Sequence, residues 1–212
     1  MNINELHEHA HSISKIIVDK LRRPASVTNI EKAEFHVQEL GIPHPRYFNL
    51  IPYLKYEPGE HEKENSVIGM LAMLCLDYPV VIDEVLKSLE GDENIDLRGV
   101  LAYNLGVVGM GSSDNSTKID LLEKMLNDPN ERVRIFVVRS LSKYADSNSD
   151  KVGPLILKAL NDKSLNVIRE CLVCLKHHPI KGSVEALRKI SERADLAVYI
   201  NDINQALKFQ SN

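Results

Sequence analysis

The sequence contains no tryptophan, and aromatic residues make up only 5% of its 212 residues. Nucleic-acid and base-binding sites commonly stack bases on aromatic rings, so this shortage disfavours them. The three cysteines, Cys75, Cys171 and Cys174, are an odd number that forms no disulfide framework, which predicts a reducing, cytoplasmic environment. No apolar run is long enough to predict a membrane-spanning helix, and the first twenty residues do not have the pattern of a secretory signal.

The remaining composition is that of an ordinary globular chain. Hydrophobic residues make up 43% and charged residues 26% of the sequence, which excludes wholesale disorder. The formal net charge of −4 disfavours a surface that binds nucleic acid.

Apolar residues recur every three or four positions along almost the whole chain, and no segment alternates with the period of two that strands require. Gly41 and the prolines at 24, 43 and 45 mark early helix ends and connections. The pattern predicts an all-α protein. The expected helices span 3–21, 30–40, 46–55, 64–77, 79–89, 95–109, 117–126, 130–144, 151–160, 164–177, 183–193 and 195–209.

A similar string of residues recurs at intervals close to 34 residues. DPNERVRIFVVRSL begins at Asp128, DKSLNVIRECLVCL begins 34 residues later at Asp162, and DENIDLRGVLAYNL begins 36 residues earlier at Asp92. A further copy begins at Glu62, and a looser one at Asp195. In each clear copy an acid precedes an aliphatic residue by five positions, and apolar residues follow at fixed offsets. Such a period, with two helices in each unit, is typical of an α-solenoid.

These repeats resemble HEAT repeats, most closely in the DPxxxVR string at 128–134. The resemblance implies a single α-solenoid domain over residues 1–212, a right-handed superhelix of five to six helix pairs. Residues 60–210 would form the repeats, and residues 1–58 an irregular N-terminal cap. The recurring acids are expected to cap the second helix of each pair. Arg98 and Arg134, at equivalent repeat positions, are expected to pair with acids of neighbouring repeats.

Residues 7–11, His-Glu-His-Ala-His, satisfy the HExxH pattern of zinc hydrolases. The extended pattern requires glycine and histidine where this chain has Ser14 and Ile17, and no strand precedes the motif. We interpret the match as coincidental, so the sequence predicts no metal site. Cys171 and Cys174 fall within a repeat helix and are expected to be core residues. His177 and His178 are interpreted as a helix C-cap, and the glycines at 106–111 as a connection. No motif predicts catalysis or a cofactor.

A second resemblance concerns residues 30–51, IEKAEFHVQELGIPHPRYFNLI, which look similar to the N-terminal region of the HEAT-like alkylpurine DNA glycosylases. That family implies a basic groove, tryptophans against the lesion, a catalytic aspartate and an arginine on the DNA backbone. This chain has no tryptophan and has Arg98 near the expected position of the aspartate, whereas Arg134 could match the backbone arginine. The resemblance implies a DNA-binding relative that has lost glycosylase chemistry.

The repeat register also predicts which side chains face outward on the concave face of a solenoid. On the helix at 130–144 the apolar positions point inward, which leaves Arg132, Phe136 and Arg139 on exposed flanks. Neighbouring helices add Tyr103, Arg169 and Lys176. Arginine and aromatic residues are typical of interface anchors. We therefore expect a non-catalytic protein-interaction module, an adaptor, scaffold or neutralising partner, with the DNA-binding relative as the alternative.

Overall fold

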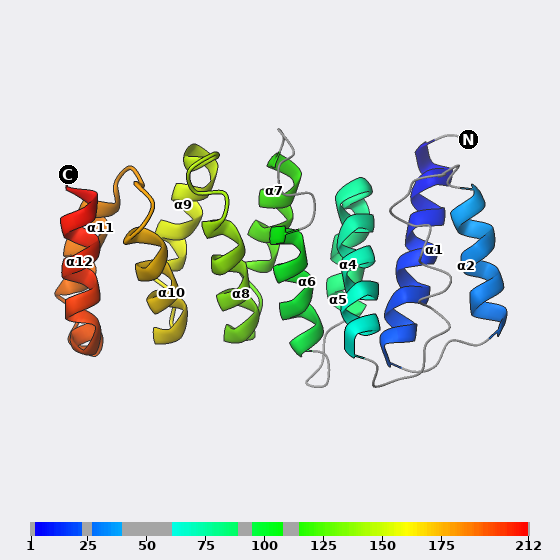
Figure 1. Ribbon diagram of the computed structural model, residues 1–212, viewed down its shortest axis with the longest axis horizontal. Helices are drawn as coiled ribbons and strands as arrows, with labels where there is room; N and C mark the ends of the chain where they lie inside the picture. Colours follow the sequence, from blue (N-terminus) through cyan, green and yellow to red (C-terminus); the bar gives the residue numbers. More distant parts are fainter. Residues whose placement is uncertain (1–2, 23–26, 40–60, 89–94, 108–114, 212) are drawn as a thin grey trace. The chain divides into compact units, whose positions relative to one another are not determined.

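The computed structural model describes residues 3–22, 27–39, 61–88, 95–107 and 115–211, and every regular element among them is a helix. The predicted all-α, HEAT-like solenoid is confirmed over these residues (Figure 1). The contacts divide the chain into an N-terminal unit, residues 1–108, and a C-terminal unit, residues 109–212. The predicted helix at 46–55 lies outside the described residues.

The N-terminal unit is built around its first helix. Its elements are α1 (Ile3–Arg22), α2 (Val27–Glu39), α4 (His61–Asp77), the 3₁₀ turn η1 (Pro79–Val81), α5 (Ile82–Ser88) and α6 (Ile95–Val107). α1 packs against α2, α4 and α5, and α4 packs against α6. Ala10, Ile13 and Ile17 are buried as the apolar stripe predicts, but Ile3 is 67% exposed because it is the first residue of the helix.

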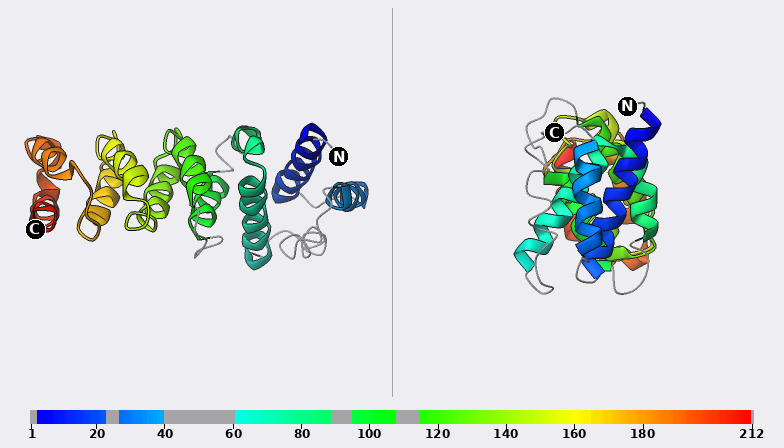
Figure 2. Two further views of the ribbon diagram at one scale, coloured as in Figure 1. Left: turned by 90° about the horizontal axis from the view of Figure 1, so that it is seen from above. Right: turned by 90° about the vertical axis from the view of Figure 1, so that its right-hand side faces the viewer.

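The C-terminal unit consists of three successive helix pairs. Its elements are α7 (Ser116–Met125), α8 (Glu131–Ser142), α9 (Ser149–Ala159), α10 (Leu165–Leu175), α11 (Ser183–Ser191), the 3₁₀ turn η3 (Ala194–Tyr199) and α12 (Ile200–Gln210). The two helices of each pair pack together, and α10 packs against both α8 and α12. Within this unit the second helices therefore form one layer and the first helices another (Figure 2).

The last predicted helix, 195–209, is wrong in its first turns. The chain forms the 3₁₀ turn η3 before α12 begins at Ile200. 3₁₀ turns are frequent at the ends of α-helices, and apolar periodicity alone does not distinguish them from an α-helical turn.

Equivalent repeat positions carry the core of the C-terminal unit. Val133 on α8 and its counterpart Val167 on α10 are both 0% exposed, and so are the two further matched pairs, Val138 with Leu172 and Leu141 with Leu175. The repeat register read from the sequence is therefore the packing register of the helices.

Cys171 and Cys174 are free and buried, as predicted for core residues, and Cys75 is also free and buried. Burial raises the pKa of the Cys75 thiol to about 12 and raises the pKa values of Cys171 and Cys174 above the ordinary range. A thiol becomes a nucleophile or metal ligand when it is deprotonated. These thiols are therefore packing groups at neutral pH.

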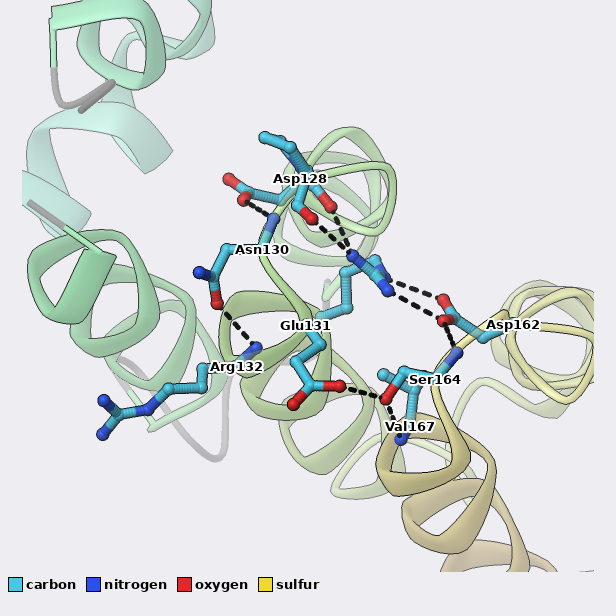
Figure 3. Close-up of polar contacts among 9 residues, drawn as sticks. Asp128, Asn130, Glu131, Arg132, Asp162, Ser164 and Val167 are labelled. Atoms are coloured by element: carbon cyan, nitrogen blue, oxygen red, sulfur yellow. Dashed lines mark hydrogen bonds and ion pairs between the residues drawn. The ribbon is translucent and has the colours of Figure 1, made fainter. Parts of the chain in front are cut away.

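The prediction that the recurring acids cap the second helices is wrong for α8 and α10, because other residues are the caps. The helix caps are Asn130, whose side chain accepts a hydrogen bond from the Arg132 N–H at 2.8 Å, and Ser164, which accepts one from the Val167 N–H. Each acid lies two residues before its cap: Asp128 accepts from the Asn130 N–H at 2.8 Å, and Asp162 from the Ser164 N–H at 2.7 Å. The acids therefore stabilise the turn that presents the cap, since an aspartate readily bonds a backbone N–H two residues ahead (Figure 3).

The predicted pairing of Arg134 with the acid of the neighbouring repeat is confirmed. Its Nε and Nη2 donate to the two carboxylate oxygens of Asp162 at 2.7 and 2.8 Å, and its Nη1 donates to the carbonyl oxygens of Asp128 and Pro129. The Arg134 side chain is only 5% exposed. Burial alone would raise the pKa of Asp162, but the hydrogen bonds from Arg134 and the Ser164 N–H bring it below its ordinary value. One guanidinium thus joins two successive turns.

Candidate interaction face

The exposed side of the second helices in the C-terminal unit is the candidate functional site, and we call it the second-helix face. On α8 it carries Arg132 and Arg139, both exposed, and Phe136, which is half-buried. The guanidinium carbon of Arg139 lies 5.8 Å from the centre of the Phe136 ring, within the range of a cation–π contact. In Figure 3 the Arg132 side chain points away from the turn network around Asp162. Arg132 and Arg139 are exposed as the sequence predicts, whereas Phe136, also predicted to be exposed, is half-buried.

Arg139 also makes a two-pronged contact with Glu170 on α10. Its Nε and Nη2 donate to the two Glu170 carboxylate oxygens at 3.0 and 2.8 Å. These hydrogen bonds raise the pKa of Arg139. The Arg139 side chain remains 51% exposed, while that of Glu170 is only 15% exposed. The pair therefore fixes the direction of the guanidinium and leaves half of its side chain open to solvent.

The next helix continues the face toward the end of the unit. Arg169 is exposed on α10, and Val173 is an exposed aliphatic side chain with 42% of its surface accessible. Lys176, directly after α10, donates from its ammonium to the Asp202 carboxylate on α12 at 2.7 Å. The second-helix face thus combines cations with apolar side chains, and two of the cations are held by acids of the next second helix.

Tyr103 belongs to the N-terminal unit, where it is 46% exposed on α6. It precedes Arg139 by 36 residues, the repeat interval that the sequence gives between these two helices. Its membership of the same face stays a prediction from that register.

The repeat geometry agrees with a comparison to known families. Residues 82–176, just under half of the chain, match the family model described as HEAT repeats. These residues are HEAT repeats. No curated protein matches the chain. The resemblance of residues 30–51 to the alkylpurine DNA glycosylases stays a prediction, as does the N-terminal cap.

HEAT repeats in general act as scaffolds for protein interaction, and the family is typically non-catalytic. None of the helices in the described part of the chain has both the length and the apolar character that crossing a bilayer requires.

Two acids of the face, Glu170 and Asp202, were not predicted from the sequence. Glu170 lies 31 residues from Arg139, and Asp202 lies 26 residues from Lys176, so neither falls at the same position of a neighbouring HEAT repeat. A search for opposite charges between outward positions about one repeat apart could have found them.

Two histidines of the segment 7–11 meet different helices. His9 approaches His36 on α2, and the Nδ1 of His11 lies against the Glu84 carboxylate on α5. Within the described residues, no group of three or more histidine, cysteine or acidic side chains is placed to hold a metal ion.

His177 and His178, interpreted as a helix C-cap, directly follow the C-cap residue Lys176, and their backbone N–H groups donate to the Cys174 carbonyl. Nδ1 of His178 lies 2.7 Å from the carboxylate of Asp146, a residue that follows α8, so this side chain also joins two successive helix pairs. Of the glycines at 106–111, Gly106 lies in α6 and the others are outside the described residues.

Proposed function

We propose that this protein is a non-catalytic interaction module of the cytoplasm, an adaptor, scaffold or neutralising partner that binds another protein through its second-helix face. The three free, buried cysteines support a reducing compartment. The residues proposed to contact the partner are Arg132, Phe136, Arg139, Arg169 and Lys176, together with Tyr103 of the N-terminal unit. No cofactor is required for this role.

One observation carries the proposal: cations and apolar side chains alternate on the exposed side of adjacent second helices. Arg139 stands over the Phe136 ring, and Val173 is open on the next helix. Arginine and aromatic side chains supply a large share of the binding energy in protein interfaces because they bury much area and make several hydrogen bonds. The proposed partner therefore presents carboxylates next to apolar groups.

The ion pairs of the face support the same reading. Glu170 holds the Arg139 guanidinium in one orientation, and a side chain that is already ordered loses less entropy when a partner binds. More than half of the Arg139 side chain is exposed, so a partner carboxylate can reach it without displacing Glu170.

The test begins by capturing the partner through cross-linking and identifying it by mass spectrometry. Its affinity is then measured by calorimetry for the natural chain and for the double variant Arg132→Glu/Arg139→Glu. We expect the double variant to weaken binding by at least about 2 kcal/mol, roughly thirtyfold, if both residues are central anchors. Because the reversed charge at position 139 would face the Glu170 carboxylate, the milder Arg132→Gln/Arg139→Gln variant is measured as well.

The matched control reverses two exposed charges elsewhere. Arg188 and Lys189 lie on α11, in the layer of first helices, and both are exposed. The variant Arg188→Glu/Lys189→Glu changes the net charge by the same amount and is expected to leave affinity unchanged. Equal weakening by both double variants would show a general charge effect and contradict the proposed face.

The same variants separate protein binding from DNA binding. If the cations of this face neutralised several phosphates of a DNA duplex, the affinity for the duplex would fall steeply between about 50 and 200 mM salt. The logarithm of the binding constant would fall against the logarithm of the salt concentration with a slope near about −0.9 for each phosphate contacted. Unchanged affinity for the captured protein, with loss of salt-sensitive duplex binding in Arg132→Glu/Arg139→Glu, would favour the DNA-binding relative over the interaction module.

A further inference from the structure

Two imidazole rings from different helices of the N-terminal unit meet through the same type of nitrogen. Nδ1 of His9 on α1 and Nδ1 of His36 on α2 lie 2.9 Å apart, and the ring centroids are 5.1 Å apart. Both side chains are half-buried, and the Phe35 ring packs within 6 Å of each. The pair lies across the packed α1–α2 contact and outside the second-helix face.

Two facing imidazole nitrogens at this distance need one proton or one metal ion between them. If both were unprotonated the lone pairs would repel each other, and if both were protonated the two donors would. One proton satisfies the pair as an ordinary hydrogen bond, in which the Nδ1–H of one neutral ring donates to the Nδ1 lone pair of the other, and one metal ion can take the place of that proton. Neutral imidazole is also a common ligand for zinc, copper and nickel.

We propose that His9 and His36 form a two-imidazole site for a divalent transition-metal ion that accepts ligands at right angles, of the Cu²⁺ or Ni²⁺ class. Water completes the coordination, because both rings are only half-buried. A bound ion joins α1 to α2.

The nitrogen separation sets the preferred geometry. With metal–nitrogen distances of about 2.0–2.1 Å, two nitrogens 2.9 Å apart subtend an angle of about 90° at the metal. That is the angle between neighbouring ligands in square-planar Cu²⁺ and Ni²⁺ or octahedral Ni²⁺ complexes. A tetrahedral zinc site would need nitrogens about 3.3 Å apart at the same bond length.

The electrostatics of the pair agree with metal binding at neutral pH. Burial lowers the pKa of His36, and the nearby His9 and Lys32 lower it further. His36 is therefore neutral at pH 7, and a neutral ring offers a lone pair to a metal ion. A zinc site of the HExxH type would be a different one, made by His7 and His11, and Nδ1 of His11 is already in contact with Glu84.

The test titrates Cu²⁺ and Ni²⁺ separately into the metal-free full-length protein, with calorimetry for affinity and electron paramagnetic resonance for Cu²⁺. We expect one ion for each chain and a Cu²⁺ spectrum with hyperfine splitting from two nitrogens. His9→Ala and His36→Ala should each weaken binding at least about tenfold, since loss of an outer-shell partner alone commonly has that effect. Zn²⁺ should bind more weakly than Ni²⁺.

Two single-histidine controls decide which residues are ligands. His7→Ala tests the HExxH alternative, and His177→Ala tests the exposed histidine after α10; both should retain the natural affinity. His36→Gln keeps a polar side chain of similar length, and circular dichroism checks that each variant stays helical. Unchanged Ni²⁺ affinity in a folded His36→Gln variant, or equal loss in His7→Ala, overturns the proposal.

A second measurement tests the link between the two helices. Amide hydrogen exchange in α2 should slow when Ni²⁺ is added to the natural chain, because a ligand that binds only the packed form stabilises it. It should not slow in His36→Gln. If Ni²⁺ binds but leaves α2 exchange unchanged in the natural chain, the ion is not held between α1 and α2 and the proposal is wrong.

Discussion

The described contacts between neighbouring helices mostly use guanidinium or ammonium with carboxylate in the C-terminal unit, where His178–Asp146 is an exception, and imidazole around α1 in the N-terminal unit. In the C-terminal unit, Arg134 meets Asp162, and two further cation–carboxylate pairs link α8 to α10 and α10 to α12. In the N-terminal unit the contacts on either side of α1 use imidazoles: His9 with His36 on α2, and His11 with Glu84 on α5. Both units pack helices side by side, so the difference lies in the chemistry of the joining groups.

The difference matters because guanidinium, ammonium and carboxylate keep their charges throughout the physiological pH range, whereas imidazole changes its charge close to neutrality. The three cation–carboxylate pairs of the C-terminal unit therefore keep their charges across that range, whereas the described polar contacts of α1, like the His178–Asp146 contact of the C-terminal unit, involve imidazole. This contrast also suits the proposed roles, since a binding face needs fixed charges and a metal site needs neutral imidazoles. Four variants or conditions test the contrast.

The largest expected effect comes from Asp162→Ala. The substitution leaves the buried Arg134 guanidinium without its carboxylate and the Ser164 N–H without its acceptor. Removal of one partner from a buried ion pair destabilises a protein by about 3–5 kcal/mol, and we expect the lower end because Asp162 is partly exposed. Urea unfolding, with hydrogen exchange read in α8 and α10, measures the change. Asp162→Asn, which retains an acceptor for Ser164, should lose less; a loss below about 1 kcal/mol in the alanine variant would contradict the buried-pair account.

Asn130→Ala should have a smaller effect. It removes the side chain that caps α8, and loss of such a cap typically lowers the free energy of unfolding by about 1 kcal/mol. Asn127→Ala, three residues earlier at an exposed position outside the helix, is the matched control and should change stability by less than about 0.5 kcal/mol. Equal effects of the two substitutions would mean that the Asn130 side chain does not cap the helix.

Mild acid should affect the two units differently. The pKa of His36 is lowered by burial, by His9 and by Lys32, so the folded state favours its neutral form. Its contribution to stability is complete above about pH 6.5 and is lost as the pH falls below that value toward the lowered folded pKa. Asp162, whose pKa is lowered by Arg134 and Ser164, keeps its contribution down to about pH 3.9. The loss of stability caused by protonation of His36 is expected to be smaller than that caused by loss of the α8 cap, because the His36 side chain is only half-buried.

Hydrogen exchange between pH 7.5 and 5.0, corrected for intrinsic rates and with a metal chelator present, checks this expectation. Protection of α2 should fall across the range while protection of α10 stays constant. His36→Gln should remove the pH dependence of α2. Parallel loss of protection in both helices would show that the two units respond to acid together.

The smallest expected effect comes from Glu170→Gln. Arg139 is half-exposed, and exposed ion pairs contribute only about 0.2–1 kcal/mol. The variant should therefore unfold almost as the natural chain does, and the small difference should shrink further at 1 M salt. A decrease of more than about 2 kcal/mol in the free energy of unfolding would contradict this expectation, since it exceeds what an exposed ion pair contributes. Glu170 would then stabilise the contact between helices about as strongly as Asp162 does.

Much of the architecture is determined by the sequence, because helices are encoded by local periodicity. The offsets between Val133 and Val138, and between Val167 and Leu172, specify which side of each second helix is buried, and the structure buries all four residues. The repeat interval likewise places Arg134 opposite the acid of the next repeat. The same register places Arg132, Phe136 and Arg139 on flanks outside the core. Turn chemistry was harder to predict, since an aspartate before a helix can cap it or, as Asp128 does, support the residue that caps it.

Only the tertiary structure decided which polar side chains meet. Glu170 reaches Arg139, Asp202 reaches Lys176, and His36 reaches His9 across 31, 26 and 27 residues of chain. These partners lie on different helices, so their distance depends on how far one helix is rotated and shifted against the next. Apolar periodicity fixes the buried side of a helix to within about one residue step, roughly 100° of rotation, whereas a hydrogen bond requires atoms within about 3 Å. Side-chain packing between the helices supplies that remaining precision.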